Sequence, residues 1–189
     1  MAAKQKVINL AMVGCGGMAG AHLNGYQELL QRGEKRFRIV AAVDAALDRA
    51  RGFAERIEGF AGWPVNTYAS VEQLLNSETD LDGADICSPH GLHHVLACEL
   101  LAGGVNVLVE KPMAASTAEA QQMVAAATRA GKLLMVEMKW RFMPELLAAR
   151  QAEIAAERDY ITALGDYWIA RVELEAAVGT RLEYDRGDH

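Results

Sequence analysis

The sequence predicts an α/β fold: a doubly wound parallel sheet with helices on both faces. Short, continuous apolar runs alternate along the chain with longer stretches in which apolar residues recur at helical spacing. Continuous apolar runs are typical of strands buried on both faces, and right-handed crossovers between them give a doubly wound sheet. A glycine-rich segment directly after the first run, residues 7–13, supports the same fold.

The glycine-rich segment reads Gly14-Cys15-Gly16-Gly17-Met18-Ala19. In this pattern Gly14 permits a tight turn, Gly16 lets the backbone approach a pyrophosphate, and the small Ala19 lets a helix pack closely on the strand. The helix expected over residues 19–30 then offers unpaired N–H groups and a partial positive charge to the anion. The pattern therefore predicts a dinucleotide site.

The second predicted strand, residues 37–43, ends at Asp44, whose carboxylate can accept hydrogen bonds from a ribose diol. The interval from the glycines exceeds the usual value of about 20 residues, and the polar residues 31–36 can absorb the excess. A carboxylate here repels a 2′-phosphate, so the expected cofactor is NAD, with NADP less favoured. Arg49, in the following helix, could reach in and weaken that preference.

Four further strands and four further helices are expected in the first domain, residues 1–139. The strands are expected at residues 63–68, 84–88, 105–109 and 133–136. The helices are expected at residues 47–58, after Ser70, at residues 92–102, and from residue 116 to 130. Ser70 with Gln73, and Ser116 with Glu119, have the spacing of capping boxes.

Polar segments directly follow three of these strands, and parallel strands bring their carboxyl ends to one rim. The segments are Asp44, Ser88-Pro89-His90 and Glu110-Lys111-Pro112. A lysine at a water-poor rim can exchange protons near neutral pH, although a Glu–Lys dipeptide is usually a solvated surface pair. His90 and His93 could be read as a metal pair, but the spacing supplies no third ligand, and imidazoles lining a cleft are the alternative.

The second domain, residues 140–189, is expected to be the beginning of an incomplete α+β substrate domain. Pro144 suits a first helical position, and residues 145–158 are strong helix formers. Gly165-Asp166 then predicts a turn, and residues 167–175 alternate as a half-buried strand. Because one strand is not stable alone, a homo-oligomer through this C-terminal strand is expected as one outcome.

Composition limits the other partners of this chain of 189 residues. A net charge of −6 argues against nucleic acid, and no run approaches the about 20 apolar residues of a membrane span. The three cysteines lack metal-ligand spacing, so a reducing cytoplasm is expected. Lys4 and Lys6 before an apolar run faintly suggest a lipoprotein signal instead, but that run is short and interrupted by Asn9.

The motifs together resemble the Gfo/Idh/MocA oxidoreductases over nearly the whole chain and in the order of that family. The resemblance is carried by the glycine loop, Asp44, Ser88-Pro89 with His93, the run from Ala102 to Pro112, Arg141-Phe142-X-Pro144, and Leu164-Gly165-Asp166 before the predicted strand. It implies a Rossmann domain and hydride transfer between NAD(P) and a sugar-like or polyol substrate.

The resemblance also implies a role for each matching residue. Pyrophosphate would be cradled by Gly14, Gly16, Gly17, Met18 and Ala19, and the adenosine ribose held by Asp44. The nicotinamide side would be lined by Ser88, Pro89 and His90, with His93 where the family keeps its histidine, Glu110 near the nicotinamide ribose and Arg141 near the nicotinamide end. Lys111 would be catalytic, orienting the substrate oxygen and taking part in proton transfer. His90 stands where an asparagine is common in relatives.

The length departs from the family, whose members continue through a large open sheet carrying an acid–histidine pair. Residues 185–189 have the right residue types for that pair but come too early, and are expected to be a solvated tail. Two alternatives to the oxidoreductase therefore stay open. One is a dinucleotide-binding module without catalysis, and the other is a dehydratase or glycosidase that oxidises and re-reduces its substrate with retained NAD.

Overall fold

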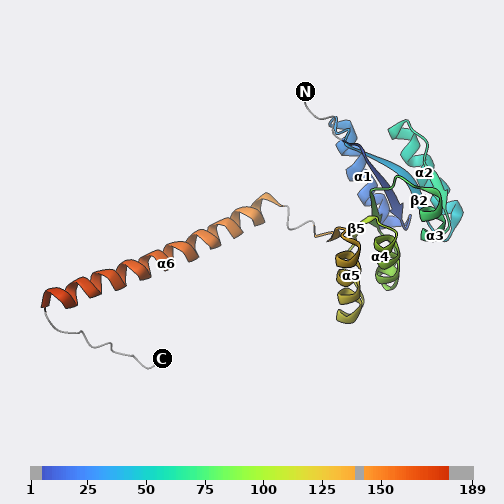
Figure 1. Cartoon of the computed structure of the whole chain (residues 1–189). Coiled ribbons are helices and arrows are strands. Elements are labelled where there is room, and N and C mark those ends of the chain that lie inside the picture. The colour runs from blue at the N-terminus through green and yellow to red at the C-terminus, as the bar shows by residue number, and fades with distance from the viewer. Residues whose placement is uncertain (1–5, 139–142, 179–189) are drawn as a thin grey trace. The chain divides into compact units, whose positions relative to one another are not determined.

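The computed structural model describes residues 6–138 and 143–178. The chain divides into two compact units, Met1–Met138 and Lys139–His189. Each unit is described by itself (Figure 1).

The first unit is built on six parallel strands in the order β3-β2-β1-β4-β5-β6. The strands are β1 (Ile8–Val13), β2 (Phe37–Val43), β3 (Asn66–Tyr68), β4 (Gly83–Ile86), β5 (Asn106–Val109) and β6 (Leu134–Val136). Strand order reverses between β1 and β4, which makes the gap beyond their carboxyl ends the switch point where ligands bind in such sheets. The predicted doubly wound sheet is confirmed.

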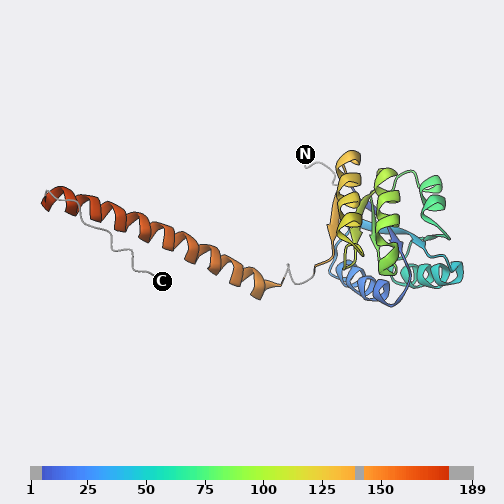
Figure 2. The same ribbon diagram turned by 90° about the horizontal axis from the view of Figure 1, so that it is seen from below.

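Helices cover both faces of the sheet (Figure 2). They are α1 (Gly17–Gln31), α2 (Leu47–Ala61), α3 (Val71–Ser77), α4 (His93–Ala102) after a 3₁₀ turn (His90–Leu92), and α5 (Thr117–Ala130). The core is divided accordingly: one apolar cluster joins the sheet to α1 and α2, and the other joins it to α3, α4 and α5. The hydroxyls of Ser70 and Ser116 accept from the N–H groups of Gln73 and Glu119, each at 3.2 Å, as the two capping boxes predict.

One row of side chains crosses the α1 face of the sheet and becomes more exposed toward β6. The strand register places Met12, Asp85, Leu108 and Met135 side by side in this row. Met12 is buried beneath α1, whereas Met135 is 46% exposed. Asp85 therefore lies between the part of the sheet that α1 covers and the more exposed part. Because its side chain is buried, its carboxylate needs hydrogen-bond partners, and α1 is the nearby helix.

The second unit differs from the sequence-based expectation. A single helix, α6 (Pro144–Val178), replaces the predicted turn at Gly165-Asp166 and the predicted strand over residues 167–175. In the described residues no strand follows β6, so a strand here would have no partner, whereas a helix closes its backbone hydrogen bonds within the segment. The strand was a wrong prediction, and oligomerisation through its edges loses its basis. None of the helices in the two described ranges is both long and apolar enough to cross a membrane.

Replacing Gly165 by alanine tests the helical assignment. In a helix interior alanine is favoured over glycine by about 1 kcal/mol, so Gly165→Ala is expected to increase the helical signal in far-ultraviolet circular dichroism. A decrease would instead indicate a turn at this position. Gly131→Ala is the matched control, because Gly131 ends α5 with a left-handed φ of 61°. That change is expected to lower the free energy of unfolding by about 1 kcal/mol.

Candidate functional site

The turn after β1 brings two loops into backbone contact at the switch point. Gly14 has a φ of +89°, and a Cβ atom placed on it would lie 2.7 Å from the amide nitrogen of Ser88. No side chain fits there, so the tight turn expected of Gly14 is a steric requirement. The Gly14 N–H donates to the carbonyl of Val43 at 2.8 Å, which joins the same turn to the end of β2.

The N-terminus of α1 faces open space. Gly16 is its N-cap and makes no side-chain capping bond, and the N–H of Gly20 is the first to reach back, to the Gly16 carbonyl at 3.1 Å. A Cβ atom on Gly16 or Gly17 would meet nothing within 4 Å. Met18 is exposed, whereas Ala19 is buried in the core beneath the helix. Unpaired N–H groups beside free space are what a bound phosphate requires.

Asp44 links the glycine turn to the end of β2. One carboxylate oxygen accepts from the Cys15 N–H at 3.0 Å, the other accepts from the Ala46 N–H at 2.9 Å, and an Arg49 nitrogen lies 3.5 Å from the first. A cleft of about 430 Å³ begins beside Asp44 and is also lined by Gly14, Ser70, Ser88 and Pro89. The Ser88 hydroxyl oxygen is buried without a hydrogen-bond partner in the described residues. The cleft is thus lined by Asp44 and Ser88 beside the Gly14 turn, and the Ser88 hydroxyl lies buried behind its surface.

His93 joins the Ser88 loop to the Glu110-Lys111-Pro112 loop. Its side chain is fully buried, and its ring nitrogens lie 2.8 Å from the Pro112 carbonyl oxygen and 2.9 Å from the Ser88 carbonyl oxygen. Both nitrogens are thereby occupied, which leaves neither for the metal pair considered with His90. His90 is exposed and meets the His93 ring edge to face. The geometry shows His93 holding two loops together.

Glu110 and Lys111 point in different directions at the end of β5. Glu110 is only 7% exposed, and one of its carboxylate oxygens accepts from the Lys111 N–H at 2.7 Å. The residue Lys111 itself is exposed at the rim. The alternative of a solvated surface ion pair therefore does not describe Glu110, whose carboxylate is directed inward. Arg141, the remaining predicted site residue, lies outside the described residues.

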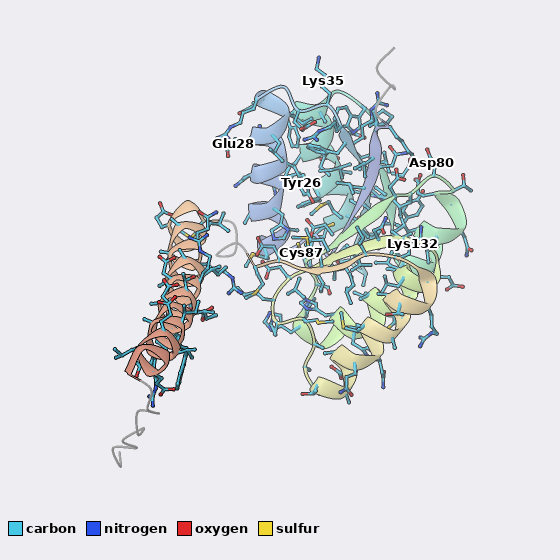
Figure 3. All side chains as sticks on the ribbon, turned by 60° about the vertical axis from the view of Figure 1, so that its left-hand side comes forward. Tyr26, Glu28, Lys35, Asp80, Cys87 and Lys132 are labelled. Atoms are coloured by element: carbon cyan, nitrogen blue, oxygen red, sulfur yellow. The ribbon has the colours of Figure 1, made fainter. Side chains whose placement is uncertain are left out.

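The structure also contains a polar cluster next to the Glu110-Lys111-Pro112 loop that the sequence analysis did not predict. His22 of α1 places one ring nitrogen 2.8 Å from Asp85 and the other 3.3 Å from Glu110. The Tyr26 hydroxyl, one helical turn on, donates to Asp85 at 3.0 Å, and the Cys87 sulfur lies 3.4 Å from His22. Tyr26 and Cys87 mark the α1 side of the sheet in Figure 3. The available signal was a lone aspartate in an apolar strand, which requires a polar partner.

Electrostatics fix the protonation of this cluster. The hydrogen bond to Asp85, and then the bond to Glu110, raise the pKa of His22 to about 9 against the opposing effect of burial. Burial, reinforced by Asp85, raises the pKa values of the Tyr26 hydroxyl and the Cys87 thiol, and burial raises the pKa of Cys15 to about 12. Donor atoms of His22, Asp85 and Cys87 lie within 4.8 Å of one another. His22, whose pKa is raised, forms a hydrogen-bonded bridge between the side chains of Asp85 and Glu110.

Comparison with known proteins agrees with this geometry. Residues 8–138 match the family described as "Oxidoreductase family, NAD-binding Rossmann fold". The chain is 32% identical over 135 residues to trans-1,2-dihydrobenzene-1,2-diol dehydrogenase of Mus musculus, covering 71% of this chain and 37% of that protein. It is 33% identical over 144 residues to D-apiose dehydrogenase of Paraburkholderia graminis, covering 75% and 35%.

A solved structure is similar over a larger part of the chain. The crystal structure of GenD2 from gentamicin A biosynthesis, in complex with NAD, superposes with a TM-score of 0.66 at 26% identity. The match covers 84% of this chain and 42% of GenD2. The chain therefore spans less than half the length of these three relatives.

The His22 bridge predicts a pH-dependent stability. The pKa of His22 is raised to about 9 in the folded chain from 6.5, so the bridge contributes fully below about pH 6.5 and its contribution is lost as the pH rises toward 9. Comparing His22→Gln with the parent in urea should show a stability difference that shrinks by about 2 kcal/mol over this interval, a value discounted for solvent screening. His94→Gln is the control and should keep the pH dependence of the parent. A constant difference between parent and His22→Gln would contradict the bridge.

Proposed function

The chain belongs to the Gfo/Idh/MocA oxidoreductase family, and from this we propose that it binds NAD(H) for hydride transfer to or from a sugar-like or polyol substrate. The observation that carries the proposal is the convergence of three features at the switch point. These are the open N-terminus of α1, the Gly14 turn and the Asp44 carboxylate.

The residues at the switch point fit a dinucleotide. A pyrophosphate would take the N–H groups at the start of α1, where Gly16 and Gly17 leave the approach clear. The ribose diol of the adenosine would donate to Asp44 at the mouth of the cleft. The unsatisfied hydroxyl of Ser88 gives a further polar atom on the side where the nicotinamide would lie.

Asp44 also favours NAD over NADP. A 2′-phosphate beside its carboxylate would suffer charge repulsion, and Ala45 and Ala46 bring no compensating cation. Arg49 lies 3.5 Å from the carboxylate and neutralises it in part. The proposed preference is therefore for NAD with weaker binding of NADP.

Lys111 is the proposed catalytic residue. When bound, the dinucleotide accepts or donates the hydride at its nicotinamide ring. The Lys111 amino group, exposed at the rim beyond β5, would hold the substrate oxygen; as the neutral amine it would accept the proton that leaves an alcohol, and as the ammonium it would return that proton to a carbonyl oxygen being reduced. The names of the mouse and Paraburkholderia relatives, a diol and an apiose dehydrogenase, support a substrate with neighbouring hydroxyl groups.

The cellular setting belongs to the same proposal. Cys15, Cys87 and Cys98 are all free thiols, which is the state expected in a reducing cytoplasm. The net charge of −6 favours a small-molecule substrate over nucleic acid.

A second candidate is a dinucleotide-binding module without catalysis. It is favoured by the described residues that follow the sheet. In the described residues only α6 follows the sheet, and many of its apolar side chains are exposed, among them Ile154, Ile161, Trp168 and Val172.

Cofactor titration tests the binding site. Calorimetry is expected to give tighter binding of NADH than of NADPH, because of Asp44. Gly16→Val should abolish binding of both while leaving the thermal midpoint within a few degrees of the parent, since the added side chain enters open space that the pyrophosphate needs. If a folded Gly16→Val variant binds with unchanged affinity, the glycine segment is an ordinary turn and not a pyrophosphate site.

Turnover tests the role of Lys111. With NAD⁺ and a panel of sugars and vicinal diols, Lys111→Ala is expected to lower kcat by about a hundredfold and to change the Kd for NADH by no more than about twofold. Lys35→Ala is the control, because Lys35 precedes β2 and lies at the far end of α1 from Cys87 (Figure 3). Equal loss of kcat and affinity would make Lys111 a binding residue, and NADH binding without turnover by the parent would favour the second candidate.

A further inference from the structure

A continuous series of hydrogen bonds connects α1 to the backbone of the proposed catalytic lysine. The His22 ring bridges Asp85 and the first carboxylate oxygen of Glu110, at 2.8 and 3.3 Å. The second oxygen of Glu110 accepts from the N–H of Lys111 at 2.7 Å. Both acidic residues are buried: the exposed fraction is 1% for Asp85 and 7% for Glu110.

We propose that His22 is a positioning residue for Lys111: it fixes the buried carboxylate of Glu110, and that carboxylate holds the Lys111 backbone at the rim. The role of Lys111 rests on the proposed function, whereas the hold on its backbone does not.

The geometry gives this task to His22 alone. Within the described ranges, His22 is the side-chain donor to the first oxygen of Glu110, and Tyr26 donates only to Asp85. A glutamate side chain with a free carboxylate can adopt several rotamers, so a second anchor is needed to keep its other oxygen on the Lys111 N–H.

The two acidic side chains on either side of His22 also require a group between them. Asp85 from β4 and Glu110 from the end of β5 approach the ring from the sheet, together with the Cys87 thiol, and Tyr26 approaches from α1. Without a cation between them, the two buried carboxylates would repel each other in a medium of low dielectric constant. Glu110, at the start of a loop, would be the one free to move away.

The cluster offers a matched pair of variants. His22→Gln removes the bridge, whereas Tyr26→Phe removes a hydrogen bond to Asp85 and leaves the His22–Glu110 contact intact. A purely structural cluster would respond in the same way to both changes. If His22 positions Lys111, only His22→Gln should change the behaviour of the Lys111 backbone.

Hydrogen exchange at the Lys111 amide, measured without cofactor, is the direct test. The Val107 amide, which donates to the Leu133 carbonyl at 2.9 Å, gives the reference for overall stability. Relative to Val107, exchange at Lys111 is expected to be about tenfold faster in His22→Gln, because a buried hydrogen bond is lost, and unchanged in Tyr26→Phe. Equal ratios in the two variants would overturn the proposal.

If His22→Gln fails to fold, the same test can be made on the parent protein by varying the pH. The protection of Lys111 relative to Val107 is expected to fall as the pH passes about 9, where His22 loses its proton. A constant ratio through this range would overturn the proposal. Failure of the parent to bind NADH would overturn the proposed function and leave these exchange results standing, so the two failures are distinguishable.

Discussion

The contact between the backbones of Gly14 and Ser88 is the constraint on which the rest of the site depends. Because no Cβ atom fits between these loops, the ends of β1 and β4 approach more closely than side chains would allow. The helix α1 begins at Gly17, three residues after this contact, and has no side-chain cap on its first N–H groups. Asp44 then secures the turn through the Cys15 N–H. The proposed anion site is thus made by backbone geometry, with side chains serving to fix it.

The lysine loop is held from two sides by two histidines that work differently. His93 contacts the loop on the α4 side through the Pro112 carbonyl, a neutral backbone acceptor. His22 contacts it on the α1 side through the Glu110 carboxyl group, a side-chain acceptor. The loop that carries Lys111 is therefore anchored from both faces of the sheet.

Much of the first unit could be predicted because its signals are local. β2 occupies the predicted residues, and both capping boxes form, since each depends on a few neighbouring residues. The His22 cluster could not be predicted, because its partners are 63 and 88 residues away in the sequence. The strand expected at residues 167–175 failed for a related reason. An alternating apolar segment becomes a strand only when other strands accept its hydrogen bonds, and α6 satisfies its own.

The two buried thiols have a consequence for resistance to oxidation. Cys15 lies in the glycine turn at the start of α1, and Cys87 lies beside the His22 ring, both places where a thiolate would ordinarily be stabilised. Burial and the neighbouring carboxylates Asp44 and Asp85 instead keep both sulfurs protonated. Peroxides and alkylating agents attack the thiolate form. Both thiols are therefore expected to react with oxidants more slowly than an exposed cysteine of ordinary pKa.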